Sequence, residues 1–320
     1  MTKKNMDRNL ALEFVRVTEA AAISAAKWIG SGDKNAADGA AVDAMRSRLN
    51  QIDFAGTVVI GEGKKDKAPM LYTGEKFGKG KNPAMDLAID PLECTNSVAH
   101  GRYNAMSVIA AGAKKTLLNA PDTYMEKIAV GQKAKKVIDL EAPVKENIIK
   151  VAKALGKSLN EITVLMLDRE RHYEIIKEIR KIGARVRLIT DGDVAGAIAP
   201  SLEDSNIDIL MGTGASAEAV LAATAIKILG GEILARFKPL KDEHTEELKK
   251  AGIYNLKKIY TAEDLAKGKM LTFTATGIIE GPLLKGVEFK SNSVITHSIV
   301  IRGISGTIRY ITTHHHHHNI

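Results

Sequence analysis

The segment between residues 144 and 237 alternates between helix-like and strand-like patterns, and this alternation limits the possible folds more than any other feature. Four strand-like runs lie at 162–167, 184–189, 207–211 and 232–237, with helix-like stretches between them. Strands separated by helices predict a parallel sheet with right-handed crossover connections. We therefore expect an α/β fold in this half of the chain.

Polar side chains follow these strands directly. Arg169 and Arg171 come after the first strand, the segment Asp191-Gly192-Asp193 comes after the second, and Glu218 opens the helix after the third. Ligands of open α/β sheets bind beyond the carboxyl ends of the strands. Two arginines suit a phosphate by charge and geometry, although they could also form an ordinary solvated helix start.

The stretch from Met85 to Asn96 holds two carboxylates and a hydroxyl close together. An apolar run ends at Asp90, where Pro91 is expected to stop the strand, and Glu93 and Thr95 stand at the start of a short expected helix. Carboxylates held this close are costly unless a cation lies between them. The sequence predicts a divalent-metal site here, and the alternative is an acidic turn that caps a helix.

Three further acids stand at element ends. Asp33 lies in a tight loop between two expected helices, where it could equally be a helix N-cap. Glu62 lies between Gly61 and Gly63 at the end of a strand, and Glu218 has been named above. With Asp90 and Glu93 they form a set of oxygen ligands, which select hard cations such as Mg²⁺ or Mn²⁺. Two such ions could activate water against a phosphate ester, but spacing alone does not show that the five acids converge.

The length of 320 residues predicts two domains or one large α/β unit, and the hydrophobic fraction of 45% is ample for a packed core. We expect an N-terminal α+β domain at 1–140 with most metal ligands and a C-terminal α/β domain at 141–313 with the substrate-binding residues. The histidine run near the end resembles a tag or low-complexity tail, so residues 314–320 are excluded from the expected fold.

The net charge is +8, and the lysine and arginine residues are spread along the chain with acids nearby. This distribution does not favour nucleic acid as a partner. No stretch is long and apolar enough to span a bilayer, and the single cysteine, Cys94, fits a reducing compartment. We expect a cytoplasmic protein without a membrane partner, and the positive charge is compatible with small phosphorylated substrates.

Several motifs occur in the order found in one enzyme family. They are Gly32-Asp-Lys-Asn-Ala-Ala-Asp-Gly, Ile60-Gly-Glu-Gly63, Ala68-Pro-Met-Leu71, Asp90-Pro-Leu-Glu93 with Thr95, Asn119-Ala-Pro-Asp-Thr-Tyr-Met-Glu-Lys127 and Asp191-Gly-Asp193. From about Asn9 to Thr312 the chain resembles the class II fructose-1,6-bisphosphatases, in the lithium-sensitive phosphatase superfamily. The resemblance implies a layered αβαβα sandwich of the sugar-phosphatase type, dependence on Mn²⁺ or Mg²⁺, and gluconeogenic use. It also implies a small phosphorylated sugar as substrate and a homo-oligomer. The Asp90–Asn96 turn looks closest to the subgroup that also hydrolyses sedoheptulose-1,7-bisphosphate.

The resemblance also implies roles for individual residues. The metal ligands would be Asp33, Glu62, Asp90, Glu93 and Glu218. Thr95 would orient the attacking water, with Asp66 nearby, as the catalytic pair. The substrate would contact Glu93, Cys94, Thr95, Tyr124, Arg169, Glu170, Arg171, Asp191, Gly192 and Asp193.

The chain departs from the family pattern at a few positions. Cys94 stands where the family has glycine, Lys64 and Lys67 flank Asp66, and the segment from Gly214 to Ala219 differs. An impaired or non-enzymatic sugar-phosphate-binding homologue is therefore an alternative. A weaker alternative is a nicotinamide-dependent oxidoreductase, because residues 212–217 match a dinucleotide fingerprint, although a tight strand-to-helix turn explains the match as well.

Overall fold

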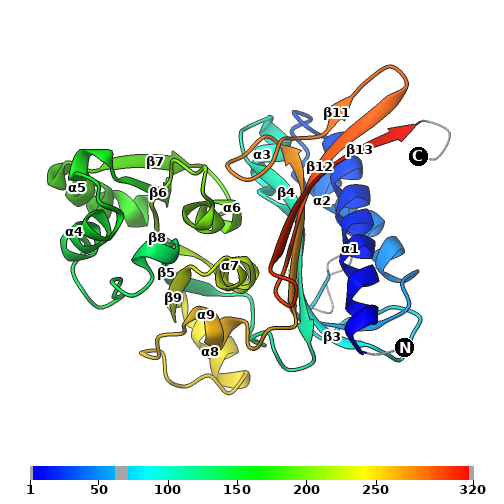
Figure 1. Ribbon diagram of the computed structural model, residues 1–320, viewed down its shortest axis with the longest axis horizontal. Helices are drawn as coiled ribbons and strands as arrows, with labels where there is room; N and C mark the ends of the chain where they lie inside the picture. The colour runs from blue at the N-terminus through cyan, green and yellow to red at the C-terminus, as the bar shows by residue number, and fades with distance from the viewer. Residues whose placement is uncertain (1–2, 62–70, 317–320) are drawn as a thin grey trace. The chain divides into compact units, whose positions relative to one another are not determined.

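The computed structural model describes residues 3–61 and 71–316 (Figure 1). The chain divides into two compact units, residues 1–119 with 268–320 and residues 120–267. Each unit contains a mixed β-sheet with packed helices, which confirms the expected α/β class. The division differs from the expected boundary near residue 140, because the strand at 271–279 pairs with the strand at 105–113.

The first unit is built on a sheet that has eight strands among the described residues, in the order β11-β12-β10-β4-β3-β1-β2, with β13 paired to β12. Its elements are α1 (Lys3–Ala26), α2 (Lys34–Leu49), β1 (Ala55–Ile60), β2 (Lys76–Phe77), β3 (Ala84–Glu93), α3 (Thr95–His100), β4 (Ala105–Ala113), β10 (Leu271–Ile279), β11 (Glu288–Phe289), β12 (Ser293–Arg302) and β13 (Thr307–His316). Helix α1 packs on β10 and β12, and α2 packs on α1 and β3. Phe14, Met45, Leu49 and Phe54 are fully buried in this core.

Strand β3 does not stop at Pro91 as expected, but continues to Glu93. Its parallel pairing with β1 ends at Ala88, and its pairing with β4 becomes irregular between Asp90 and Glu93. Proline is tolerated at such an irregularity because no ladder hydrogen bond is required from its nitrogen. The irregularity places both carboxylates at the end of a buried strand.

The expectation that residues 314–320 lie outside the fold is wrong for the first three of them, because these three belong to β13. His314, His315 and His316 pair with Ile295, Val294 and Ser293 of β12. Thr296 and the His315 ring are hydrogen-bonded at 2.9 Å, which ties this end of β13 to the sheet.

The second unit contains a sheet in the order β7-β6-β8-β5-β9. Its elements are β5 (Tyr124–Val130), η1 (Gln132–Ala134), α4 (Val144–Leu155), η2 (Leu159–Glu161), β6 (Thr163–Leu167), η3 (Glu170–His172), α5 (Tyr173–Ile182), β7 (Arg185–Ile189), α6 (Val194–Ile198), η4 (Ala199–Ser201), β8 (Ile209–Ala215), α7 (Ser216–Ile228), β9 (Glu232–Phe237), α8 (Asp242–Lys250) and α9 (Ala262–Leu265). Strands β6, β7 and β8 are parallel, as expected. The sheet is nevertheless mixed, because β5 enters antiparallel between β8 and β9.

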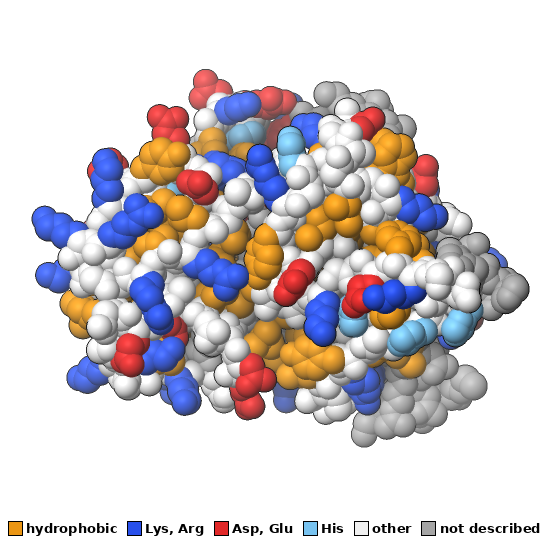
Figure 2. All heavy atoms as spheres, turned by 90° about the horizontal axis from the view of Figure 1, so that it is seen from above, with side chains coloured by type: hydrophobic (Ala, Val, Ile, Leu, Met, Phe, Trp, Pro, Cys, Tyr) orange, Lys and Arg blue, Asp and Glu red, His pale blue; other side chains and the backbone are white. Residues whose placement is uncertain are grey.

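Two further features concern the charges on the surface and the length of the helices. On the face shown in Figure 2, lysine and arginine side chains are dispersed among acidic and uncharged ones rather than gathered in one patch. None of the described helices is long and apolar enough to cross a membrane.

Candidate active site

The end of β3 brings together the acids and hydroxyl that the sequence singled out. Asp90 and Glu93 are 6% and 1% exposed, and the Asp90 carboxylate accepts a hydrogen bond from the Leu92 amide at 3.0 Å. The Thr95 hydroxyl donates to the Leu92 carbonyl at 3.2 Å. Two nearly buried carboxylates on one turn, with a partly buried hydroxyl beside them, are suited to an oxygen-ligated cation.

Cys94 joins this strand to α3 in a left-handed conformation, with φ 73° and ψ 49°. A side chain in this conformation is strained by about 1–2 kcal/mol, and glycine is not. The thiol packs in the core of the first unit, and Asn104 donates its side-chain N–H to Sγ at 3.2 Å. The backbone therefore has the shape that glycine favours, while the side chain lies among apolar neighbours.

Asp33 caps α2, because its carboxylate accepts a hydrogen bond from the Ala36 amide at 2.9 Å. The loop before it is attached to α3: the amides of Gly30 and Gly32 donate to the carbonyls of Val98 and Ala99, both at 2.9 Å. The helix-cap interpretation is thus correct for its hydrogen bonding. The same loop also lies beside the helix that follows Asp90 and Glu93.

The structure describes only part of the expected metal-ligand set. Glu62 and Asp66 lie outside the described residues, and Glu218 belongs to the other unit. Within residues 3–61 and 71–316, no group of three or more histidine, cysteine, aspartate or glutamate side chains is arranged to hold a metal ion. Asp90 and Glu93 supply oxygen donors only, and this donor set fits Mg²⁺ or Mn²⁺ better than a softer metal.

In the second unit, the carboxyl ends of β6, β7 and β8 gather most of the expected substrate-binding residues. Arg169 follows β6 and donates to the Thr190 carbonyl at 2.6 Å and to the Asp191 carboxylate at 3.4 Å. Arg171 donates twice to the Thr213 carbonyl, at 2.6 and 3.1 Å. Arg169 is thus held against the loop that follows β7, and Arg171 is held against the last residues of β8.

Tyr124, at the start of β5, completes this edge. The Arg171 guanidinium carbon lies 5.5 Å from the centre of the Tyr124 ring. Burial lowers the pKa of Arg171, and the charge of Arg169 nearby lowers it further. Two guanidinium groups close enough to perturb each other favour an anion beside them.

His172 fixes the short helical turn that carries Glu170 and Arg171. Its buried ring accepts a hydrogen bond from the Thr213 amide on Nε2 at 2.8 Å, so its other nitrogen donates to the Leu167 carbonyl at 2.8 Å. Burial lowers the pKa of His172, which agrees with this neutral tautomer. Thr213 is therefore held by His172 through its amide and by Arg171 through its carbonyl.

Lys127, Asp193 and Glu218 form a buried ion triad in the same unit. The Lys127 ammonium is 2.6 Å from Asp193 Oδ1 and 3.3 Å from Glu218 Oε2, and it donates to the Ala215 carbonyl at 3.1 Å. The Lys127 and Asp193 side chains are only 1% and 4% exposed. Burial and the nearby Asp193 raise the pKa of Glu218 to about 8, although Lys127 opposes this rise. One cation therefore holds an expected sugar-binding carboxylate and an expected metal ligand together.

Comparison with known proteins places these features in one family. Residues 8–315 match the family described as bacterial fructose-1,6-bisphosphatase, glpX-encoded. The chain belongs to this family of bacterial fructose-1,6-bisphosphatases. It is 48% identical to a fructose-1,6-bisphosphatase class 2 of Haemophilus influenzae, over 318 residues that cover 96% of each chain. It is 46% identical to fructose-1,6-bisphosphatase 1 class 2 of Escherichia coli K12, over 96% of this chain and 95% of the relative.

In this fructose-1,6-bisphosphatase family member, the segment that matched a dinucleotide fingerprint forms a tight turn. The amide of Ala215 donates to Glu218 Oε2 at 2.9 Å, so a carboxylate already caps α7. A Cβ at Gly214 would collide with the Asp193 carboxylate and would lie 2.9 Å from both Glu218 Oε2 and Lys127 Nζ. Gly214 thus serves close packing against the ion triad, and the turn does not resemble a phosphate cradle.

The role of Lys127 was not among the expectations from the sequence. A signal was present, because Lys127 is followed directly by the apolar run Ile128-Ala129-Val130 of the same strand. A lysine is almost never fully buried without a partner, so its position next to that run predicts nearby carboxylates. The sequence could not say which ones, since Asp193 and Glu218 lie 66 and 91 positions away.

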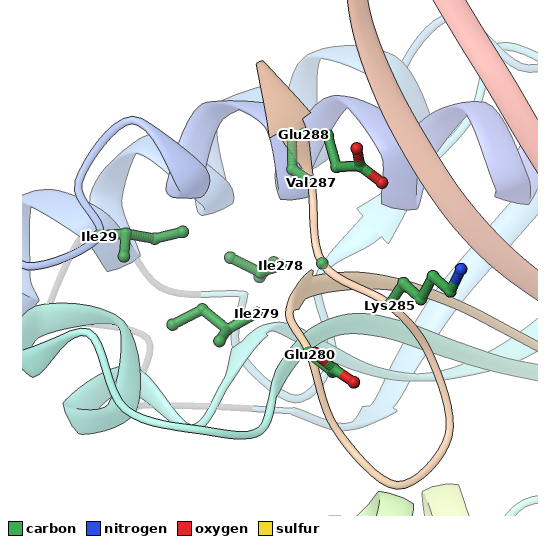
Figure 3. Close-up of a pocket in the computed structure, with 8 residues that line it drawn as sticks. Ile29, Ile278, Ile279, Glu280, Lys285, Val287 and Glu288 are labelled. Carbon is green, nitrogen blue, oxygen red and sulfur yellow. The ribbon is translucent and has the colours of Figure 1, made fainter. Parts of the chain in front are cut away.

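A surface cavity of about 370 Å³ lies in the first unit (Figure 3). It is lined by Ile29, Ile278, Ile279, Glu280, Lys285, Gly286, Val287 and Glu288. Figure 3 shows the isoleucine side chains together on one side, while the Lys285 ammonium points away from them. Among the residues that the structure describes, none of those lining the cavity is an expected catalytic, metal or substrate residue.

Proposed function

We propose that the protein hydrolyses the 1-phosphate of fructose-1,6-bisphosphate in gluconeogenesis and uses Mn²⁺ or Mg²⁺. Membership of the family over residues 8–315 carries this proposal, since the curated relatives are named for the same activity. The acids of the β3 turn and the arginines of the second unit support it. They supply the two kinds of group that a metal-dependent sugar phosphatase needs.

On this proposal, the second unit binds the sugar phosphate. Arg169 and Arg171 would bind the phosphate that is not cleaved, and Asp191 and Asp193 would accept hydrogen bonds from sugar hydroxyls. The arginines already donate to backbone carbonyls and are pre-organised at one edge of the sheet. Binding would therefore cost little side-chain entropy.

The first unit would carry the chemistry. Asp33, Glu62, Asp90 and Glu93, with Glu218 of the second unit, would hold the divalent ions. The ions, when bound, would supply Lewis-acid chemistry by activating water and neutralising charge on the phosphate. Thr95 would orient the attacking water, and Asp66 would take its proton as the water oxygen bonds to phosphorus. The sugar oxygen would leave as its own bond to phosphorus breaks and would take up a proton from solvent water.

The identity of the product tests this proposal. We expect equal amounts of fructose 6-phosphate and inorganic phosphate, measured by coupling the sugar product to isomerase and glucose-6-phosphate dehydrogenase. Asp90→Asn should abolish product formation and leave the far-UV circular dichroism spectrum unchanged. Release of the 6-phosphate instead, or wild-type turnover by Asp90→Asn, would contradict the assignment. Activity on sedoheptulose-1,7-bisphosphate and homo-oligomerisation remain predictions.

A further inference from the structure

His244, on helix α8, lies against the Tyr124 ring and has no role in the function described above. The two ring centres are 5.5 Å apart and the ring planes are tilted by 37°. Aromatic rings at this separation attract each other beyond the area that they bury. Because the Arg171 guanidinium also lies 5.5 Å from the Tyr124 ring, the orientation of Tyr124 is fixed by two neighbours.

The position of His244 follows from how α8 is anchored. Leu248, one helical turn later, is fully buried, so the helix face that carries His244 and Leu248 turns inward. Burial raises the pKa of Asp122, two residues before Tyr124, and Glu247 on the same helix is close enough to raise it further. Helix α8 therefore packs along the segment that leads into β5.

The hydrogen bonding of His244 fixes its ring as well. The amide of Leu240 donates to His244 Nδ1 at 3.3 Å, so Nδ1 is the acceptor and the neutral ring carries its proton on Nε2. The backbone amide of His244 donates to the Lys241 carbonyl at 3.2 Å, which closes the turn at the start of α8. The imidazole is thus a fixed plane beside Tyr124.

We propose that His244 is a positioning residue for the sugar-phosphate subsite, which acts by holding the Tyr124 ring in place for the bisphosphate. This inference rests on the proposed function, in which Tyr124 and Arg171 contact the substrate. His244 holds the Tyr124 ring in the orientation in which it contacts the sugar. Without the His244 ring, the Tyr124 ring can rotate. The effect falls on substrate binding, because the chemical step belongs to residues of the other unit.

The test compares His244→Ala, which removes the ring, with His244→Phe, which keeps a ring of similar size. We expect His244→Ala to raise KM for fructose-1,6-bisphosphate about fivefold with kcat within twofold of wild type. His244→Phe should stay within twofold of wild type in both constants. Glu246→Ala is the matched control, because Glu246 is an exposed residue of the same helix that pairs with Lys249, and it should change neither constant.

A double variant separates positioning from a general structural effect. If His244 acts through Tyr124, the double variant Tyr124→Ala/His244→Ala should have the same KM as Tyr124→Ala alone. A wild-type KM in His244→Ala, or effects that multiply in the double variant, would overturn the inference. If Tyr124→Ala itself leaves KM unchanged, the assignment of Tyr124 in the proposed function fails instead.

Discussion

Replacement of Lys127 by methionine should destabilise the metal-free protein strongly. The substitution keeps the length of the side chain but removes the cation that lies 2.6 Å from Asp193 and 3.3 Å from Glu218. Removal of one partner from a buried ion pair costs roughly 3–5 kcal/mol, because the remaining charge is left buried. Asp193 is the charge left without a partner, because the raised pKa of Glu218, about 8, keeps that carboxyl mostly protonated near neutral pH, so we expect a loss of about 3–4 kcal/mol.

The assay is denaturant and thermal unfolding in EDTA, so that no divalent ion can replace the ammonium group. The matched control is Lys238→Met, since Lys238 pairs with Glu126 at 3.2 Å but its side chain is 51% exposed. An exposed pair contributes about 0–1 kcal/mol, so the control should be close to wild type.

A further variant shows whether charge is the cause. The triple variant Lys127→Met/Asp193→Asn/Glu218→Gln leaves no buried charge in the ion triad, so it should recover part of the lost stability. A loss below about 1 kcal/mol in Lys127→Met, or a triple variant less stable than the single one, would refute this reasoning.

Three other predictions follow from the geometry. At Cys94, φ is +73°, so Cys94→Gly should be about 1 kcal/mol more stable than Cys94→Ala in urea unfolding. At a normal helical position the order is reversed, so Ala99→Gly in helix α3 should cost about 1 kcal/mol. A Cys94→Gly variant less stable than Cys94→Ala would contradict the strain argument. Arg171→Ala should raise KM for fructose-1,6-bisphosphate about tenfold, and KM for glycerol phosphate much less; equal changes would assign Arg171 to structure. Because the pKa of Glu218 is raised to about 8, the folded state keeps a proton that the unfolded state releases. The stability of the metal-free protein should therefore fall as pH rises from about 5 to 8. Glu218→Gln should lose this dependence of stability on pH, and an unchanged dependence would contradict the assigned titration.

The periodic parts of the sequence predicted local structure well. The helix expected from residue 144, the strand at 162–167 and the helix ending at Gly183 all appear, because their apolar spacing and glycine cap are local signals. The gathering of Arg169, Arg171, Asp191 and Asp193 was also predictable, since parallel strands place their carboxyl ends at one edge.

Long-range pairing could not be predicted in the same way. Nothing local in Tyr124–Val130 indicates that this strand enters between β8 and β9, because its partners lie far along the chain, as in the pairing of Met125 with Phe237. The end of the chain likewise joins the N-terminal strands through the pairing of β10 with β4. The ion triad and the packing of His244 on Tyr124 depend on these distant contacts, and neither was foreseen.

The most direct test of the central claim is the release of inorganic phosphate from fructose-1,6-bisphosphate by the purified protein, measured with Mn²⁺ or Mg²⁺ and again in excess EDTA. We predict steady phosphate release with at least one of the two ions and none in EDTA, with activity restored when the ion is added back. Absence of release with either ion, or full release in EDTA, would contradict the account.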